Sequence, residues 1–386
     1  MSTIKVNRIE NTSTTDGGVS IDVDGHVTID GQQLPTAGPL SNRNLIINGA
    51  MQVAQRGTTG TQTQYGGYPT CDRWHVQLDN ASQSTFTKET SGGPDGFTNF
   101  FKWNVDSADA SVAAASNVYL DQRLEGFDLQ RLGYGTSAAK PLTISFYVKG
   151  SRTGTYVLEL DNRNSSRHVG QTYTIDAADT WEYKTITFPA DTTGTFNDDN
   201  GESLRIKWWL QAGTNFTTGT LPTSWAAQSN VNNAAGQSIN LQDTAGSNWN
   251  ITGVQLEVGS KATPFEHESY GQTLAKCMRY YYRWVASTSY GRFASGLVIN
   301  STQTRVIYNL PVPMRIPPTS INPQGPFIHY DGTTAQPLNN LTIEQNNTHS
   351  VSFNSGSASG GLITGRAALV GANNSATTYI GISAEL

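Results

Sequence analysis

The stretch WNITGVQLEVGSKATPFEHESYGQTLAKCMRYYYRW, residues 249–284, decides how the chain is organised, because its periodicity changes once. Apolar and polar residues alternate at its start, pause at Gly253 and then resume, which is the pattern of a half-buried strand. After Pro264 the apolar spacing becomes about 3.6 residues, which predicts an amphipathic helix over 269–282. The apolar positions of this helix are Tyr270, Leu274, Met278 and Tyr281. A strand followed by a helix, in a chain otherwise made of strands and turns, predicts a junction between two modules.

The bulk composition argues against two classes of partner. Only 14% of the 386 residues are charged and the net charge is −5, so the chain offers no basic surface to nucleic acid or to an anionic membrane. No apolar run approaches the roughly 18–20 residues of a membrane-spanning helix, and the N-terminus lacks the pattern of a secretion signal. We therefore expect about two or three domains, neither inserted in a membrane nor exported by the usual route.

Short alternating runs predict an all-β fold. Gly, Ser, Thr, Asn and aromatic residues dominate, which favours short strands and tight turns over helices. The many alternating runs within 42–268 predict two packed antiparallel sheets, that is, a jelly-roll sandwich. Strands are expected at 100–105, 142–148, 156–160, 181–188 and 204–210, with a short helical turn within 120–132.

The two ends of the chain differ from this central module. In residues 1–41, apolar residues such as Ile4 and Val6 are few, and Asp24-Gly25 between two alternating runs predicts a hairpin. This segment cannot form a core of its own, so we expect its strands to need identical copies or a socket on another protein; a frayed tail is the alternative. Residues 269–284 are the expected linking helix. Residues 285–386 predict a small C-terminal β-sandwich, in which Pro311–Pro318 is an edge, bend or connector.

Several motifs resemble those of bacteriophage structural proteins. GVQLE (253–257), ATPFE (262–266), YG (270–271) and RYY (279–281) resemble the closing segment of the carbohydrate-binding-like jelly roll of tail-fibre and tail-collar proteins. NLIING (44–49), QRG (55–57) and DRW (72–74) resemble its opening segment. The start MSTIKVNRI resembles the attachment segment of tail fibres from phages of marine bacteria, and PMRIPPT (313–319) with the final AEL resembles the small domain that follows the jelly roll.

This resemblance implies a virion structural protein of tail-fibre type. Such a protein would be a homotrimer, assembled in the host cytoplasm, that joins other virion proteins through residues 1–41. It would adhere to a host surface glycan by non-covalent binding, without a cofactor and without catalysis. Two alternatives remain: a head fibre, capsid decoration or tail adaptor with no receptor role, and a secreted carbohydrate-binding module.

Two aromatic residues are candidate glycan contacts. In the run 204–210 the alternation places Trp208 on the core face and turns Trp209 outward, where an indole can stack on a sugar ring. Tyr147 points outward from the strand at 142–148 in the same way. Burial of Trp209 by a loop, a subunit or a domain is the alternative. The assignment of faces predicts that Trp208→Ala costs on the order of 3–5 kcal/mol and Trp209→Ala much less.

Other polar clusters favour structural roles. The six histidines have no paired spacing typical of metal ligands, and we expect no bound metal. The acidic runs at 22–25 and 198–202 lack the full ligand series of a calcium loop and are interpreted as turns. The carboxylates of Glu266 and Glu268 lie too close in sequence to flank a glycosidic bond, so no hydrolase is expected. The sequence leaves open whether Cys71 and Cys277 pair, although two reduced thiols are favoured.

Overall fold

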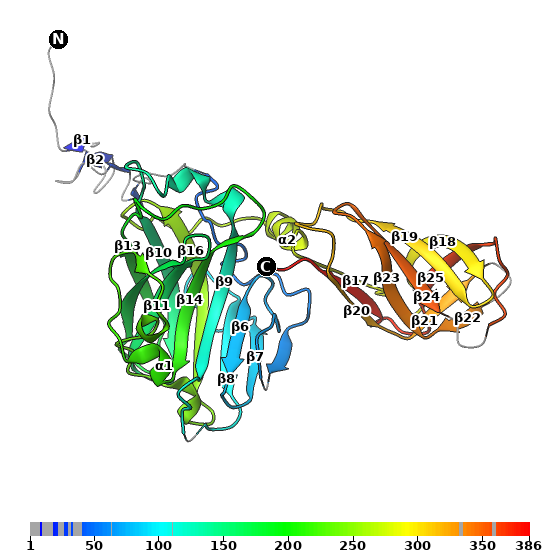
Figure 1. Cartoon of the computed structure of the whole chain (residues 1–386), viewed down its shortest axis with the longest axis horizontal. Coiled ribbons are helices and arrows are strands. Elements are labelled where there is room, and N and C mark those ends of the chain that lie inside the picture. Colours follow the sequence, from blue (N-terminus) through cyan, green and yellow to red (C-terminus); the bar gives the residue numbers. More distant parts are fainter. Residues whose placement is uncertain are drawn as a thin grey trace, which may run out of the picture. The chain divides into compact units, whose positions relative to one another are not determined.

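The computed structural model divides the chain into two compact units. The described residues are 8–9, 18–21, 27–29, 32–33, 41–62, 64–109, 111–331, 335–356 and 360–386. The first unit spans Met1–Glu268 and the second Ser269–Leu386. Antiparallel strands are the main regular structure of both units, so the all-β fold predicted from the sequence is confirmed (Figure 1).

Two six-stranded sheets form the sandwich of the first unit. Sheet I consists, in spatial order, of β13 (Glu182–Phe188), β10 (Leu142–Gly150), β16 (Asn248–Val258), β8 (Phe100–Val105), β7 (Ser84–Glu89) and β5 (Thr59–Gln62). Sheet II consists of β15 (Ala226–Ala227), β12 (Arg167–Ile175), β11 (Gly154–Asn162), β14 (Glu202–Ala212), β9 (Asn117–Glu125) and β6 (His75–Asp79).

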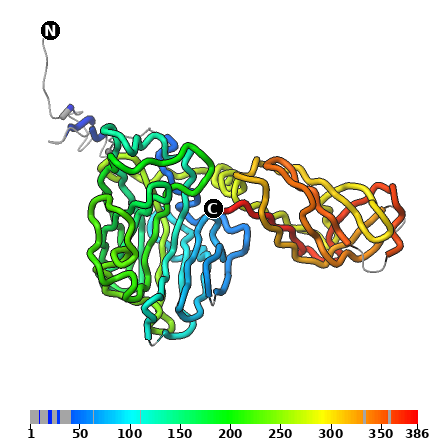
Figure 2. The backbone as a smooth tube through the Cα atoms, in the orientation of Figure 1, coloured from blue at the N-terminus to red at the C-terminus, as the bar shows by residue number. Residues whose placement is uncertain are grey.

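The chain crosses between these sheets in jelly-roll order. Strands β8, β16, β10 and β13 are neighbours in sheet I, and β9, β14, β11 and β12 are neighbours in sheet II. Among these eight strands, those that follow one another along the chain lie in opposite sheets, except β11 and β12, which form a hairpin. Figure 2 shows the resulting backbone path, in which the chain runs back and forth along the sandwich.

Apolar residues from the inner faces of both sheets fill the core. Along β14, Leu204, Ile206, Trp208 and Leu210 are all buried, as the alternation predicts. The ring of Trp208 lies edge-on to Phe146 of sheet I, with centroids 5.9 Å apart. Such contacts between large aromatic rings hold the two sheets together.

Strand β16 explains why the alternation of its sequence pauses at Gly253. Its apolar residues are buried both before and after this glycine, and the pairing with β10 slips between Ser145 and Tyr147. One additional residue in a strand makes a β-bulge, and after it the apolar side chains of β16 point into the core again. Gly253 has φ of 62°, and a Cβ there would lie 2.8 Å from the ring of Phe97. Glycine is therefore the residue that this bulge accepts.

Four short strands precede the sandwich. They are β1 (Arg8–Ile9), β2 (Val19–Ile21), β3 (Val27–Ile29) and β4 (Gln32–Gln33), paired antiparallel in chain order. Ile9 is 64% exposed, and Ile21 and Ile29 are each 42% exposed. The predicted turn at Asp24-Gly25 and the predicted strand positions Ile4 and Val6 lie outside the described residues.

The second unit contains two sheets around a smaller core. One consists of β17 (Tyr281–Val285), β26 (Tyr379–Ser383) and β20 (Ser320–Gln324). The other consists of β22 (Ala335–Leu338), β21 (Phe327–Tyr330), β25 (Ala367–Ala372), β18 (Arg292–Asn300), β19 (Gln303–Asn309), β24 (Ser350–Gly356) and β23 (Asn340–Asn346). Residues 311–318 lie outside the strands, as expected for this proline-rich run.

The helices are few and short. They are α1 (Thr214–Thr217), α2 (Tyr270–Met278) and the 3₁₀ turns η1 (Gly126–Asp128), η2 (Gln130–Leu132), η3 (Asn230–Asn232) and η4 (Leu241–Asp243). A capping box starts α2: the Ser269 side chain accepts from the Gln272 N–H, and the Gln272 side chain accepts from the Ser269 N–H. No helix in the described parts of the chain is long and apolar enough to cross a membrane.

The helix prediction over 269–282 is partly wrong. Tyr281 belongs to β17, where it pairs with Ser383, and Tyr270 is 56% exposed. Strand pairing near the C-terminus therefore ends the helix earlier than its periodicity predicts. In the same way, the turn expected within 120–132 holds η1 and η2, but its first residues belong to β9.

Candidate functional site

A covering segment, residues 213–236, lies on the outer face of sheet II. It includes α1, β15 and η3, and it is anchored at both ends and in the middle. The Gly213 N–H donates to the Ser116 carbonyl at 2.8 Å, and the Gly170 N–H of β12 donates to the Pro222 carbonyl at 2.8 Å. The Trp225 indole N–H donates to the Pro189 carbonyl at 2.8 Å. These bonds fix the segment over β11, β12 and β14.

The covering segment buries Trp209. As predicted, Trp209 lies on the face of β14 opposite Trp208, but its side chain is only 1% exposed. Its ring packs against Tyr119 and against Phe216 of α1, with centroids 5.0 Å and 5.5 Å away. The expected open stacking platform is therefore wrong, because an additional apolar layer covers this part of the sheet. A sugar ring cannot reach the indole face in this arrangement.

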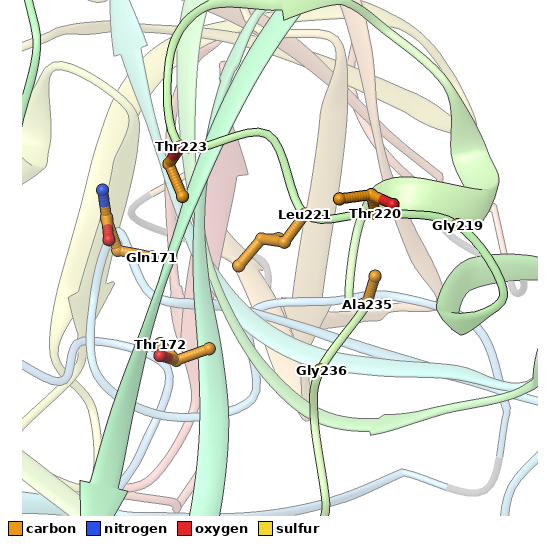
Figure 3. Close-up of a pocket in the computed structure, with 8 residues that line it drawn as sticks. All are labelled: Gln171, Thr172, Gly219, Thr220, Leu221, Thr223, Ala235 and Gly236. Carbon is orange, nitrogen blue, oxygen red and sulfur yellow. The ribbon is translucent and has the colours of Figure 1, made fainter.

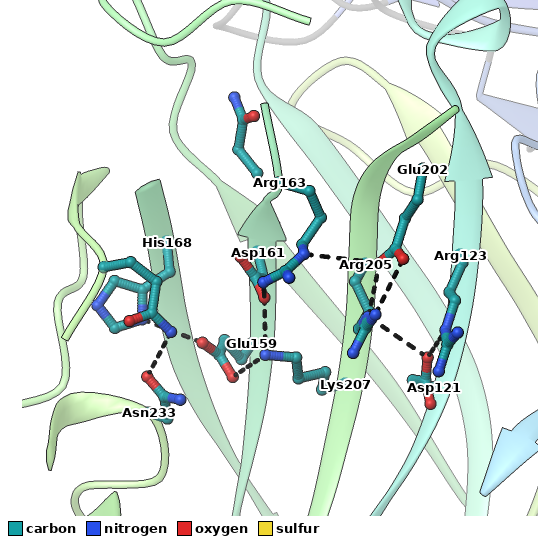
Figure 4. Close-up of polar contacts among 12 residues, drawn as sticks. Asp121, Arg123, Glu159, Asp161, Arg163, His168, Glu202, Arg205, Lys207 and Asn233 are labelled. Carbon is teal, nitrogen blue, oxygen red and sulfur yellow. Dashed lines mark hydrogen bonds and ion pairs between the residues drawn. The ribbon is translucent and has the colours of Figure 1, made fainter. Parts of the chain in front are cut away.

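Below this layer, the carboxylate of Glu159 holds three partners. Trp209 donates its indole N–H to Oε2 at 2.9 Å. His168 Nδ1 lies 3.0 Å from Oε1, and Lys207 Nζ lies 3.3 Å from Oε2 (Figure 4). Glu159 and His168 are fully buried, and Lys207 is 5% exposed. Because the carboxylate is an acceptor, His168 carries a hydrogen on Nδ1.

Lys207 connects Glu159 to a second carboxylate, Asp161. Its Nζ lies 2.8 Å from Asp161 Oδ2, which Arg163 also reaches at 3.2 Å. Burial by itself lowers the pKa of Lys207, but the two carboxylates outweigh it and raise the pKa overall. Burial likewise favours a higher pKa for Asp161, but Lys207 outweighs it and the pKa falls below its ordinary value. Both groups are therefore charged at neutral pH.

A third carboxylate, Asp121 of β9, completes the network. His75 Nδ1 lies 2.5 Å from Oδ1, Arg123 Nε donates to Oδ2 at 2.9 Å, and Arg205 Nε lies 3.7 Å from Oδ2. Burial opposes ionisation of Asp121, but His75 and then Arg123 outweigh it and lower the pKa. Arg205 also bonds both oxygens of Glu202.

The network is arranged for structure rather than for acid or base chemistry. Asp161 and Asp121 each face a cation within 2.9 Å that lowers the carboxyl pKa, so neither is held in the protonated form that a general acid needs. Glu159 faces Lys207 at 3.3 Å. The described residues contain no group of three or more His, Cys, Asp or Glu that could hold a metal ion. In the run 198–202, Asp199 Oδ1 accepts the Gly201 N–H at 2.9 Å, which is the geometry of a turn.

Tyr147 lies on the outer face of sheet I, as predicted, but inside an aromatic cluster. Its ring packs against Tyr183 of β13 and Phe97, with centroids 4.9 Å and 5.6 Å away. Tyr147 is only partly exposed, whereas Tyr183 is 49% exposed. The structure does not bring Tyr147 and Trp209 together, because they belong to the outer faces of different sheets. The two cysteines, Cys71 and Cys277, are both buried and form no disulfide.

A surface pocket lies between the covering segment and β12. It encloses about 380 Å³ and is drawn in Figure 3. Its lining residues are Gln171, Thr172, Gly219, Thr220, Leu221, Thr223, Ala235 and Gly236. Leu221 lies against β12 because residue 170 is glycine: a Cβ there would come within 2.4 Å of the Leu221 Cδ1. Gly236 has φ of 89°, a conformation that suits glycine, so the chain turns at this position.

The pocket combines apolar surface with polar groups that have no hydrogen-bond partner among the described residues. The side chains of Gln171, Thr172, Thr220 and Thr223 form no hydrogen bond with any residue that the structure describes. Hydroxyl and amide groups both donate and accept, while Leu221 supplies an apolar contact. Such a lining can bind a small uncharged molecule that carries several hydroxyl groups.

The sequence reasoning missed this pocket entirely. Its strand, β12, was not among the predicted strands, because Gly170 and several threonines weaken the apolar pattern. Val169, Tyr173 and Ile175 do alternate and are buried, which is the signal that identifies the strand. The opposite wall comes from the covering segment, whose position depends on contacts with distant strands.

Comparison with known proteins gives weak likenesses only. No protein-family model and no curated protein sequence matches the chain. Similar solved structures include the enzymatically active domain of bacteriophage CBA120 tailspike protein 4, with 10% identity, 56% of this chain and 21% of that chain covered, and a TM-score of 0.30. The chain thus spans about a fifth of that tailspike chain.

Other similar structures carry carbohydrate-binding descriptions. One is a putative sugar binding protein from Bacteroides thetaiotaomicron, with 12% identity, 56% of this chain and 100% of that chain covered, and a TM-score of 0.31. Another is the family 11 carbohydrate-binding module of a Clostridium thermocellum cellulosomal cellulase, with 14% identity, 59% and 100% covered, and a TM-score of 0.24. Because these scores are low, the function proposed below rests on the residues of this chain.

Proposed function

We propose that this protein is a bacteriophage virion structural protein of tail-fibre type that adheres to the host surface by binding a glycan. The pocket between β12 and the covering segment is the proposed contact. The observation that carries the proposal is its lining: threonine hydroxyls that have no hydrogen-bond partner among the described residues, around the side chain of Leu221. Sugars present the same combination of hydroxyl groups and apolar ring faces.

Binding without catalysis is the proposed mode of action. The eight residues that line the pocket include no acid, base or nucleophile suited to glycoside cleavage. The carboxylates of the charged network are neutralised by adjacent cations. Adhesion then depends on many weak contacts, and a homotrimer would raise the overall avidity by presenting three pockets.

The N-terminal strands are the proposed attachment and trimerisation segment. The exposed side chains of Ile9, Ile21 and Ile29 on a small sheet with open edges support this role. Immunogold labelling of intact particles tests where the protein lies on the particle. Gold at the tail is the expected result, and gold on the capsid would favour a head fibre or decoration protein instead.

A matched pair of substitutions tests the pocket. Thr172→Val removes one hydroxyl from the lining and keeps the shape, whereas Thr174→Val does the same two residues along β12, outside the pocket. A single neutral hydrogen bond contributes about 0.5–1.5 kcal/mol, so Thr172→Val should weaken glycan binding roughly twofold to tenfold. Thr174→Val should leave binding unchanged.

The assay is binding of the full chain to an array of bacterial surface glycans, followed by titration of the best ligand. No release of reducing ends should accompany binding. Equal effects of Thr172→Val and Thr174→Val would mean that the glycan binds elsewhere, and time-dependent cleavage would contradict simple adhesion.

A further inference from the structure

The pocket over β12 lacks a charged lining residue, although its sheet carries many charges. Its lining contains three threonines, one glutamine, two glycines, one leucine and one alanine. Sheet II, by contrast, carries Glu159, Asp161 and Lys207 on the outer face next to the covering segment. The pocket lining is therefore uncharged although the adjacent part of this face is charged, and this contrast limits which sugars can bind.

The cations on this face are already occupied. Lys207 lies between Glu159 and Asp161, at 3.3 Å and 2.8 Å, and is 5% exposed. Arg205, on the same face of β14 as Lys207, donates to both oxygens of Glu202, at 2.7 Å and 2.9 Å. A carboxylate, sulfate or phosphate on a ligand would therefore meet uncharged walls, and it would lose water without gaining a counter-ion.

The lining that is present suits a neutral ring. The threonine hydroxyls can donate to and accept from sugar hydroxyls, and the Leu221 side chain offers a surface for the ring C–H groups. A volume of about 380 Å³ lies at the lower end of small-ligand pockets and suits about one or two sugar rings. We infer that the pocket selects neutral saccharides and rejects those whose bound ring carries an acidic group.

This inference rests on the glycan binding proposed above and adds the class of sugar. The test compares pairs of probes that differ at one carbon: a glucose-ended and a glucuronate-ended oligosaccharide, and a galactose-ended and a galacturonate-ended one. The full chain is titrated with each probe by calorimetry, at low salt and at high salt. The neutral member of a pair should bind more tightly, by about threefold to tenfold, because the uncharged lining gives an acidic group no counter-ion in exchange for the water that it loses. Its affinity should not change with salt, since no ion pair forms.

A charge introduced at the pocket provides the converse test. Thr172→Lys places a cation in the lining and should strengthen binding of the uronate probes by about threefold to tenfold. Thr174→Lys adds the same charge on the same strand outside the pocket and is the matched control. Thermal melts of both variants report whether the fold is retained.

The outcomes separate the two proposals. Preference for the neutral probes, with an increase for uronates only in Thr172→Lys, supports the inference. Tighter or salt-dependent binding of the uronate probes by the unchanged protein would overturn it, while glycan adhesion itself would stand. Failure of every probe and of the bacterial glycan array would overturn the proposed function.

Discussion

Replacing Trp209 tests whether the covering segment truly buries the outer face of sheet II. The indole is 1% exposed, packs against Phe216 and donates its N–H to Glu159 Oε2 at 2.9 Å. Trp209→Ala removes a buried aromatic side chain, which typically costs about 3–5 kcal/mol. This reverses the expectation from the sequence alone, which placed the cost of Trp209→Ala well below that of Trp208→Ala.

Phenylalanine substitutions isolate the hydrogen bond from the packing. Trp209→Phe keeps an aromatic ring but takes a donor from a buried carboxylate, and hydrogen bonds to charged groups contribute about 1.5–3 kcal/mol. Trp208→Phe is the matched control, because the Trp208 indole N–H has no partner among the described residues. It should therefore cost less, about 1 kcal/mol from lost volume.

The assay is thermal unfolding of the full chain, following the transition of the first unit. For a unit of this size, 1 kcal/mol lowers Tm by roughly 2–4 °C. Trp209→Ala should thus lower Tm by roughly 6–20 °C, and Trp209→Phe should lower it more than Trp208→Phe does. A change of less than about 2 °C for Trp209→Ala would refute the reasoning and would mean that the indole is open to solvent.

Three further predictions concern the charged network and the N-terminus. Lys207→Met should cost about 3–5 kcal/mol in urea unfolding, because it leaves Glu159 and Asp161 as buried carboxylates without this cation; a loss below about 1 kcal/mol would contradict the burial of the pair. The pKa of Asp121 is lowered in the fold, so its contribution to stability is complete above the ordinary value of 3.8 and is lost as pH falls toward the folded value. Asp121→Asn should therefore flatten the acid arm of the Tm–pH curve below about pH 4, and an unchanged arm would show that other groups control it. Deletion of residues 1–41 should leave the sandwich folded by circular dichroism, convert a trimer to a monomer in light scattering and prevent incorporation into particles; a truncated chain that remains trimeric would place the trimer contacts elsewhere.

Regular alternation explains what could be predicted from the sequence. Strands β8, β10, β11, β13 and β14 lie close to the predicted runs, and all but β13 carry apolar residues at every second position. The prediction that one strand continues through the interruption at Gly253 is also confirmed, since β16 extends on both sides of this glycine. The face assignment of Trp208 followed from the same period and is confirmed by its place in the core.

The candidate site could not be predicted, because it depends on contacts between distant segments. Local alternation gives the direction of Trp209 but contains no information on whether residues 213–236 return over it. The pocket belongs to β12, whose pattern is broken by Gly170, and to a segment with little regular structure. Neutralisation of Glu159 and Asp161 by Lys207 likewise depends on pairing between β11 and β14.

A crystal structure of the full chain with its tightest-binding saccharide tests the central claim most directly. The account predicts a sugar ring against Leu221, within hydrogen-bonding distance of the hydroxyl group of Thr172. A saccharide ordered only on another surface, for example beside the exposed ring of Tyr183 on sheet I, would contradict it.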